Sequence, residues 1–266
     1  AADGVSAYVN RRRDPEPPVR LDAGRTGGEG TMDQQDAKPR PVMDMGMMTI
    51  VLRELRTPLS AISSSAAVLR ACPGSDSTLA PHLQAIESEL GRANRIINDV
   101  LAYARRIEPG PDTVRIGPCL RALLGEVRLP AGITLRTEIA AEDLVAAGSE
   151  ELLAGAVRRL IQNALDAMPE GGRLLVRAAR DGGMALIEVS DTGRGIPPQL
   201  RDKIFSPFFT TKARGLGLGL AIVRKVVEAH GGRVAFSGEP GKGASFTLSL
   251  PLDKYVASHF SAFPVV

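Results

Sequence analysis

Residues 190–220 have the sequence SDTGRGIPPQLRDKIFSPFFTTKARGLGLGL. It contains Asp191 next to glycines, a segment of prolines and phenylalanines that ends in Lys212, and alternating glycines at 215–219 before an apolar run. Alternating glycines ahead of a helix let backbone N–H groups approach a phosphate, and the helix dipole favours the negative charge. The sequence therefore predicts a nucleotide pocket, whose other members are Asn163, Gly241 and Gly243.

Helices and strands flank this stretch on both sides. Ser149 is a good N-cap for a helix that continues to about residue 167, because its hydroxyl can accept from the first turn. Alternation of apolar and polar residues predicts the strands. The other predicted elements are a helix at 118–128, strands at 133–139, 173–179 and 184–190, a helix at 218–229, and a closing hairpin of 233–237 with 245–250. This order predicts an α+β fold with one mixed sheet and helices on one face.

A helical hairpin precedes this part of the chain. Apolar residues recur at spacings of three and four over residues 45–71 and again over 79–104, with turn chemistry between them. Pro58 lies inside the first helix and removes one backbone donor, so a bend is expected there. Two helices of this length cannot bury their apolar stripes alone, so we expect a homodimer whose hairpins form a four-helix bundle.

Composition limits the functional classes. The 266 residues are 44% hydrophobic with a net charge of +3, and basic residues are not interleaved with aromatic ones, so no nucleic-acid binding is expected. Cys72 and Cys119 are too few for a disulfide framework or a zinc site, which favours a reducing, cytoplasmic location. No apolar run approaches the roughly 18 residues needed to cross a bilayer. Because the chain opens on Ala1 rather than Met, we expect it to be the cytosolic part of a longer protein.

Four boxes in the C-terminal half carry a family resemblance. They are LIQNALDA at 160–167, DTGRG at 191–195, FSPFF at 205–209 and GLGLGL at 215–220. In this order they resemble the catalytic domain of sensor histidine kinases and the wider Bergerat-fold ATPases. The resemblance implies an α/β sandwich over residues 111–252 that binds ATP and Mg²⁺. The hairpin then occupies 43–110, and a C-terminal tail covers 253–266. Residues 1–42 have almost no periodic apolar signal, which predicts a disordered tail.

The resemblance also implies roles for individual residues. Asn163 is the expected Mg²⁺ ligand, and Asp191 is expected to accept a hydrogen bond from the adenine amino group. Lys212 belongs to a mobile lid and is a candidate phosphate contact. Many relatives carry a second asparagine one turn before Asn163, whereas this chain has Arg159. The expected nucleotide-binding set is Asn163, Asp166, Asp191, Gly193, Gly195, Lys212, Gly215, Leu216, Gly217, Leu218 and Gly219.

The first hairpin helix carries a second resemblance. Residues 53–59, RELRTPL, are similar to the HELRTPL box of sensor histidine kinases, in which the leading histidine accepts the γ-phosphoryl group. Arg53 stands at that acceptor position, and a guanidinium has no usable lone pair and stays protonated. Glu54 and Thr57 of the box are retained, and in the family these positions assist phosphotransfer and orient water. The three histidines do not replace the acceptor: His82 and His259 are assigned no role, and His230 is expected to be partly charged at a helix C-terminus.

Three hypotheses follow from these patterns. The first is a histidine kinase core that binds ATP and Mg²⁺, docks the receiver domain of a response regulator, and serves as a scaffold or phosphatase without autophosphorylating at Arg53. The second is a fully active kinase whose acceptor histidine was replaced in this chain. The third is a Bergerat-type serine kinase or ATPase, against which the hairpin box counts.

Overall fold

The computed structural model describes residues 45–71, 76–108, 110–140, 144–212 and 215–253, all within one compact unit, Arg40–Val266. The predicted tail at 1–42, the C-terminal tail beyond residue 253 and the turn at 72–75 lie outside the described residues.

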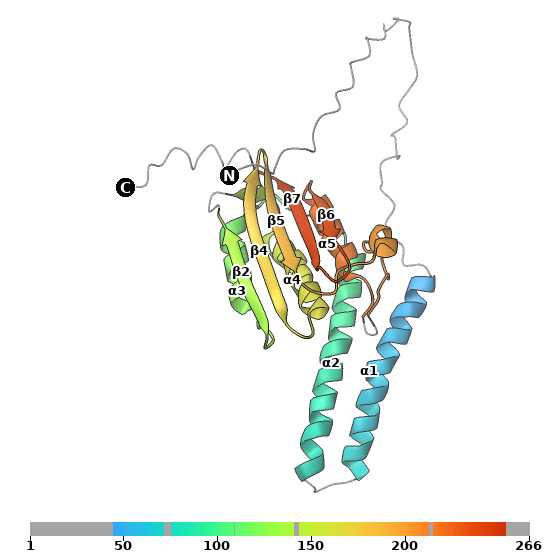
Figure 1. The fold of residues 1–266 in the computed structure, drawn as a ribbon. Coiled ribbons are helices and arrows are strands. Elements are labelled where there is room, and N and C mark those ends of the chain that lie inside the picture. Colours follow the sequence, from blue (N-terminus) through green and yellow to red (C-terminus); the bar gives the residue numbers. More distant parts are fainter. Residues whose placement is uncertain (1–44, 72–75, 109, 141–143, 213–214, 254–266) are drawn as a thin grey trace, which may run out of the picture. The chain divides into compact units, whose positions relative to one another are not determined.

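The helical hairpin has the predicted form. Helices α1 (Met45–Ala71) and α2 (Asp76–Ala104) run side by side (Figure 1). Val51 of α1 and Ala93 and Ile96 of α2 are buried. Both helices continue through a proline, Pro58 in α1 and Pro81 in α2. The predicted pair of long amphipathic helices is confirmed.

The C-terminal half is a five-stranded mixed sheet covered by helices. The strand order is β2 (Ile133–Ile139), β4 (Gly172–Asp181), β5 (Met184–Asp191), β7 (Ala244–Pro251) and β6 (Arg233–Gly238). Only β2 and β4 pair in parallel, and the other three pairs are antiparallel. Figure 1 shows α3 (Ile116–Glu126), α4 (Glu150–Ala167) and α5 (Gly219–Ala229) on the same side of this sheet. The predicted α+β fold, with helices on one face, is confirmed.

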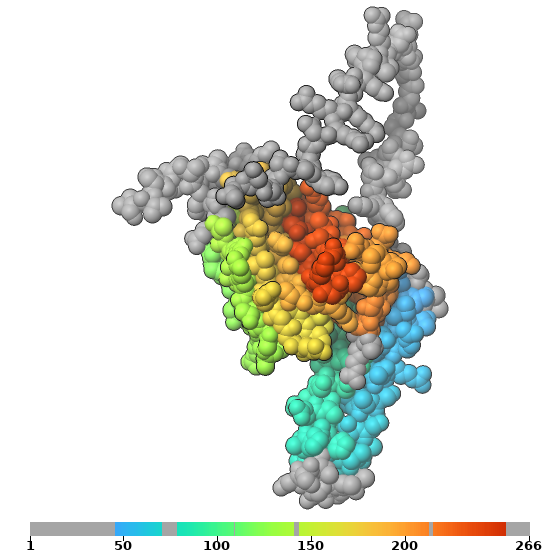
Figure 2. Space-filling view, in the orientation of Figure 1, coloured from blue at the N-terminus to red at the C-terminus, as the bar shows by residue number. Residues whose placement is uncertain are grey.

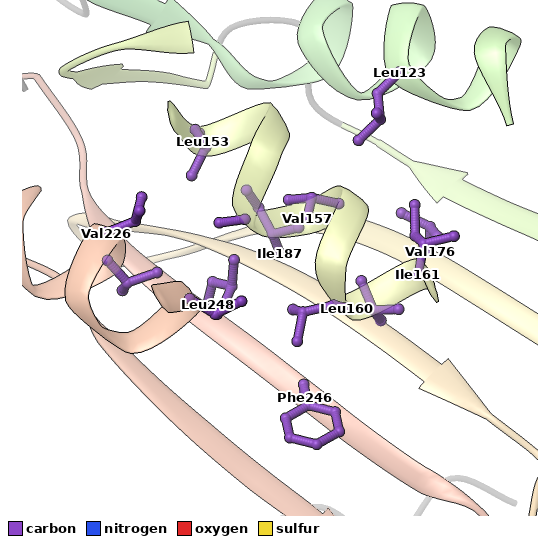
Figure 3. Packing of buried hydrophobic residues seen from close by; sticks show 14 of the residues in the cluster. Leu123, Leu153, Val157, Leu160, Ile161, Val176, Ile187, Val226, Phe246 and Leu248 are labelled. Atoms are coloured by element: carbon purple, nitrogen blue, oxygen red, sulfur yellow. The ribbon is translucent and has the colours of Figure 1, made fainter. Parts of the chain in front are cut away.

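The core lies between α4 and the sheet and is aliphatic, as the lack of tryptophan requires. Figure 3 shows α4 side chains directed toward residues of β4, β5 and β7. Alternate residues of β5 are buried because strand side chains point to opposite faces, and only one face meets the helices. The labelled residues exposed by 2% or less are Leu153, Val157, Leu160, Ile161, Val176, Ile187, Val226 and Leu248. This packing fixes α4, which carries Asn163.

Some elements differ from the predictions. Strands β1 (Thr113–Arg115) and β3 (Val145–Ala147) form a small antiparallel sheet that was not predicted. Each has three residues, too few for alternation to be detected. A 3₁₀ helix at Pro198–Lys203 was also missed, and α3 begins two residues before its predicted start and ends two residues before its predicted end.

His230 corrects a charge prediction. The Ser149 N–H donates to Nε2 over 3.1 Å, so Nε2 must be unprotonated, and Nδ1 then donates to the Val226 carbonyl over 2.8 Å. The imidazole is neutral and 6% exposed. The predicted partial charge was wrong because it considered only the dipole of α5 and not the donor that α4 presents. His230 instead ties the start of α4 to the end of α5. The predicted cap is confirmed, since the Leu152 N–H donates to Ser149 Oγ.

Candidate functional site

A cavity of about 1040 Å³ adjoins α4, the segment 194–212, the glycine loop 215–219 and α2. Its volume is at the upper end of the range typical for small-molecule sites. Ten of the eleven residues predicted to bind nucleotide line it; Gly193 is the exception and lies beside Asp191. Arg53, Glu54 and Thr57 of the hairpin box do not line it. The fold therefore brings the four C-terminal boxes together and leaves the hairpin box apart.

Asp191 ends β5 at one end of the cavity. It is 7% exposed, and Oδ1 accepts from the Gly193 N–H over 2.8 Å. Burial raises the pKa of this carboxyl, while hydrogen bonds from the backbone of Gly193 and Ala244 oppose the shift. The turn after β5 thus fixes the direction of a buried acceptor, the type of group that can select a base by its amino group.

The β6–β7 turn forms a wall beside Asp191, and its glycines Gly241 and Gly243 do not line the cavity. The Gly241 N–H donates to the Arg194 carbonyl over 2.8 Å. A Cβ added at Gly243 would collide with the Asp191 carbonyl oxygen. These two glycines shape the wall by close backbone packing.

At two other glycine positions of the predicted pocket, no other residue type would fit. Gly195 has φ of 64°, and an added Cβ would lie 2.0 Å from the Glu239 carbonyl oxygen. Gly217 has φ of 69°, and its added Cβ would lie 2.4 Å from the Phe209 carbonyl oxygen. Both positions combine a left-handed backbone with contact to another chain segment, which only glycine tolerates.

A cation already lies between the oxygens of Asn163 and Asp166. Lys212 Nζ is 2.8 Å from Asn163 Oδ1 and 2.6 Å from Asp166 Oδ2. Hard cations prefer oxygen ligands of this kind. In the part of the chain that the structure describes, no group of three or more His, Cys, Asp or Glu could hold a metal. Asn163 and Asp166 are the residues of α4 that would hold such a cation, which would offset negative charge on a ligand.

The N-terminus of α5 lies beside Asn163. Its N-cap, Leu218, makes no side-chain cap, so the first N–H groups of α5 have no side-chain acceptor at that position. A Cβ added at Gly219 would lie 4.0 Å from Asn163 Nδ2, which places this helix start beside α4. The side chains of Leu216 and Leu218 are buried in the core, so these residues can offer a ligand only their backbone. The loop has the donors of a phosphate site.

The hairpin box presents a different surface. Arg53 has a 74% exposed side chain, and Thr57, one turn later on the same face, is exposed. Glu54 is half-buried and pairs with Arg92 of α2, with Oε2 3.4 Å from Nη2. The box therefore carries an exposed cation and hydroxyl next to a carboxylate that α2 holds.

Sequence reasoning missed the contacts that join the hairpin to α4 and α5. Arg159 Nη2 lies 2.6 Å from Asp99 Oδ1 of α2. Lys225 of α5 donates to the carbonyls of Tyr103 and Arg105 at the end of α2, and burial lowers the pKa of this lysine. Arg159 was noticed as a departure from the family, but its partner is 60 residues away and no local pattern indicates it.

Known proteins resemble the chain over both parts. Residues 148–254 match the family described as histidine kinase-, DNA gyrase B- and HSP90-like ATPase, and residues 46–109 match the His Kinase A (phospho-acceptor) domain. Sensor protein DivL of Caulobacter vibrioides is 36% identical over 207 residues, 74% of this chain and 27% of DivL. Sensor histidine kinase ZraS of Escherichia coli is 32% identical over 208 residues, 76% of this chain and 44% of ZraS. The chain thus spans less than half the length of these relatives.

Solved structures of histidine kinases also resemble the chain. Full-length ShkA in complex with AMPPNP is 31% identical with a TM-score of 0.58, covering 77% of this chain and 45% of that one. Histidine kinase ThkA in complex with response regulator protein TrrA is 25% identical with a TM-score of 0.66, covering 79% of this chain and 62% of that one. Among the described residues, no helix has the length and apolar character to cross a membrane.

Proposed function

Because the chain belongs to the sensor histidine kinases, through its phosphoacceptor-type hairpin and its ATPase domain, we propose that its cavity binds ATP with Mg²⁺. The chain is then the core of a two-component signalling protein that docks a response regulator. ATP is a cytosolic nucleotide, so the proposed site would work in the cytoplasm.

One observation carries the nucleotide proposal. The Lys212 ammonium bridges Asn163 and Asp166 inside a cavity that the buried carboxylate of Asp191 also lines. The oxygens of α4 thus attract a cation, and the uncapped start of α5 suits phosphate. When bound, Mg²⁺ would offset phosphate charge and ATP would supply the γ-phosphoryl group. Asn163 and Asp166 would hold the metal, Asp191 the adenine amino group, and the loop 215–219 the phosphates.

The hairpin surface supports a homodimer. Nine of the ten large apolar side chains recorded as exposed in the described residues lie on α1 and α2. Those of α2 are spaced by four and seven residues, the repeat of a bundle seam. Figure 2 shows the lower half of both helices uncovered on the side in view. The side chains are Met48, Leu52, Leu59 and Val68 of α1, and Leu79, Leu83, Leu90, Ile97 and Leu101 of α2. A second hairpin would bury them in a four-helix bundle.

We propose further that the chain does not phosphorylate itself at position 53. A phosphoryl acceptor needs a free lone pair, and the Arg53 guanidinium has none to offer. Its exposure instead suits it to meet the phosphoryl group of an incoming partner, because guanidinium groups bind phosphate oxygens well.

The retained residues support dephosphorylation of a receiver domain. Thr57 lies one turn from Arg53 on the exposed face, where its hydroxyl could orient water against an aspartyl phosphate. Water would attack phosphorus and the aspartate oxygen would leave, giving inorganic phosphate and a free carboxylate. Glu54 is engaged by Arg92 and would position the helix surface rather than take a proton.

Two assays test this proposal. A receiver domain phosphorylated on aspartate should lose phosphate faster with the native chain, and Thr57→Ala should remove most of that gain. Ser60→Ala, another exposed hydroxyl of α1, is the matched control and should retain it. Acceleration that survives Thr57→Ala would contradict the assigned role of the hydroxyl.

A variant with histidine at the acceptor position tests the proposal that the native chain does not phosphorylate itself. With labelled ATP, Arg53→His should gain acid-labile phosphate while the native chain remains unlabelled. Labelling of the native chain on a serine would instead support the Bergerat-type serine kinase.

A further inference from the structure

Arg159 lies on the cavity side of α4 and has donors that the fold does not use. It lines the cavity together with Asn163 and Asp166, which follow it by four and seven residues on the same helix face. Its side chain is 27% exposed, and its Nε is buried without a hydrogen-bond partner in the structure. A guanidinium has five N–H donors, and a buried donor without an acceptor is costly. Arg159 therefore has an N–H donor without an acceptor beside the candidate phosphate region.

The order of groups along α4 indicates which part of a nucleotide would meet Arg159. The base end is at the C-terminus of α4, where the Arg194 N–H donates to the Ala167 carbonyl just beyond Asp191. The cation-binding oxygens of Asn163 and Asp166 come next. Arg159 is eight residues before Ala167, a rise of about 12 Å along the helix. Arg159, the one basic residue of α4 that lines the cavity, thus lies away from the base end.

Asp99 of α2 holds this cation at present. Asp99 Oδ1 lies 2.6 Å from Arg159 Nη2, and both side chains are half-buried. Guanidinium groups bind phosphate through paired donors at least as well as they bind a carboxylate. A terminal phosphate near Asn163 would therefore compete with Asp99 for the same side chain.

We propose that Arg159 is the contact for the terminal phosphate of ATP and that Asp99 competes with that phosphate for it. This inference rests on the proposed function, since it assigns a residue and a regulatory partner to the same site. ATP draws Arg159 away from α2, whereas ADP, which lacks the γ-phosphate, leaves the Arg159–Asp99 pair intact. The contact between α4 and the hairpin through the Arg159–Asp99 pair therefore depends on whether the bound nucleotide is ATP or ADP.

Calorimetric titration of the chain with Mg²⁺ and either a non-hydrolysable ATP analogue or ADP tests the proposal. Arg159→Gln should weaken binding of the ATP analogue by about 10-fold or more and leave ADP within about twofold, because one charge-assisted contact is lost only with ATP. Asp99→Asn should tighten binding of the ATP analogue and leave ADP unchanged, because the competitor is removed. The matched control is Arg158→Gln, since Arg158 pairs with Glu126 at 2.6 Å and does not line the cavity.

A double variant separates competition from a structural role. In the Arg159→Gln background, Asp99→Asn should no longer change the affinity for the ATP analogue. Equal losses for ATP analogue and ADP in Arg159→Gln, or an unchanged ratio in Asp99→Asn, would overturn the inference while leaving the nucleotide site intact. If the native chain binds neither nucleotide, the proposed function fails as well. Asp99→Asn keeps the test available should Arg159→Gln fail to fold.

Discussion

Replacing Asp191 by asparagine should change which base the cavity prefers. The native carboxylate offers only acceptors, and Oδ1 is already directed by the Gly193 N–H. The Ala244 backbone also donates to this carboxyl. An adenine amino group can donate to one of its free lone pairs, whereas the guanine carbonyl at the equivalent ring position would be repelled. Asp191→Asn puts an NH₂ group in reach of the base, which opposes adenine and can donate to guanine.

The size of the effect follows from the burial of Asp191. At 7% exposure, water cannot replace a lost partner, and a hydrogen bond to a charged group contributes about 1.5–3 kcal/mol. ATP affinity should therefore fall roughly 10- to 150-fold, while GTP affinity rises. Because burial raises the pKa of Asp191, acidification should weaken ATP binding to the native chain at a higher pH than the ordinary aspartate value of 3.8 would give. The asparagine variant should lack this pH dependence.

Calorimetry with ATP and GTP analogues measures both effects in one experiment. Asp181→Asn is the matched control, because Asp181 is an exposed carboxyl at the end of β4 and does not line the cavity. Thermal unfolding of each variant verifies that the fold is intact. Equal weakening of ATP and GTP, or unchanged affinity for both, would refute the assignment of Asp191 to the base.

Three further predictions concern stability, assembly and reactivity. His230→Ala should lower the free energy of unfolding by about 2–4 kcal/mol in urea titration, because a buried ring and its two hydrogen bonds are lost. The control His82→Ala on α2 should lower it by less than about 1 kcal/mol. Equal losses in the two variants would contradict the role of His230. Leu90→Glu should raise the dimer dissociation constant roughly 100-fold by sedimentation, since each copy places a charge in the seam, and an unchanged constant would exclude this seam. Burial raises the pKa of the Cys119 thiol from 9.0 to about 11. In a Cys72→Ser variant, where Cys119 is the remaining thiol, the folded chain should be alkylated about 100-fold more slowly than the unfolded chain. Comparable rates would show that Cys119 is accessible.

The sequence was sufficient wherever local chemistry decides the structure. The 3.6-residue repeat located α1 and α2, and Ser149 marked the start of α4, because these signals lie within one element. The glycine loop was found for the same reason, since left-handed backbone and close packing demand a residue type that is visible in the sequence.

Features that join distant segments could not be predicted. The β1–β3 sheet pairs Thr113 with Ala147, and three-residue strands carry no periodicity of their own. The charge of His230 was misjudged because its deciding donor, the Ser149 N–H, belongs to another helix. Lys212 was predicted to contact phosphate, and its present partners on α4 depend on how the segment 205–212 folds over that helix.

Titration of the native chain with a non-hydrolysable ATP analogue, with and without Mg²⁺, tests the proposed metal–nucleotide site most directly. The arrangement of Lys212, Asn163 and Asp166 predicts saturable binding at one site per chain that is at least about tenfold tighter with Mg²⁺, because Asn163 and Asp166 would hold the metal and the metal would offset the phosphate charge. Absence of saturable binding, or an affinity that Mg²⁺ does not change, would contradict the claim that this cavity is a metal–nucleotide site.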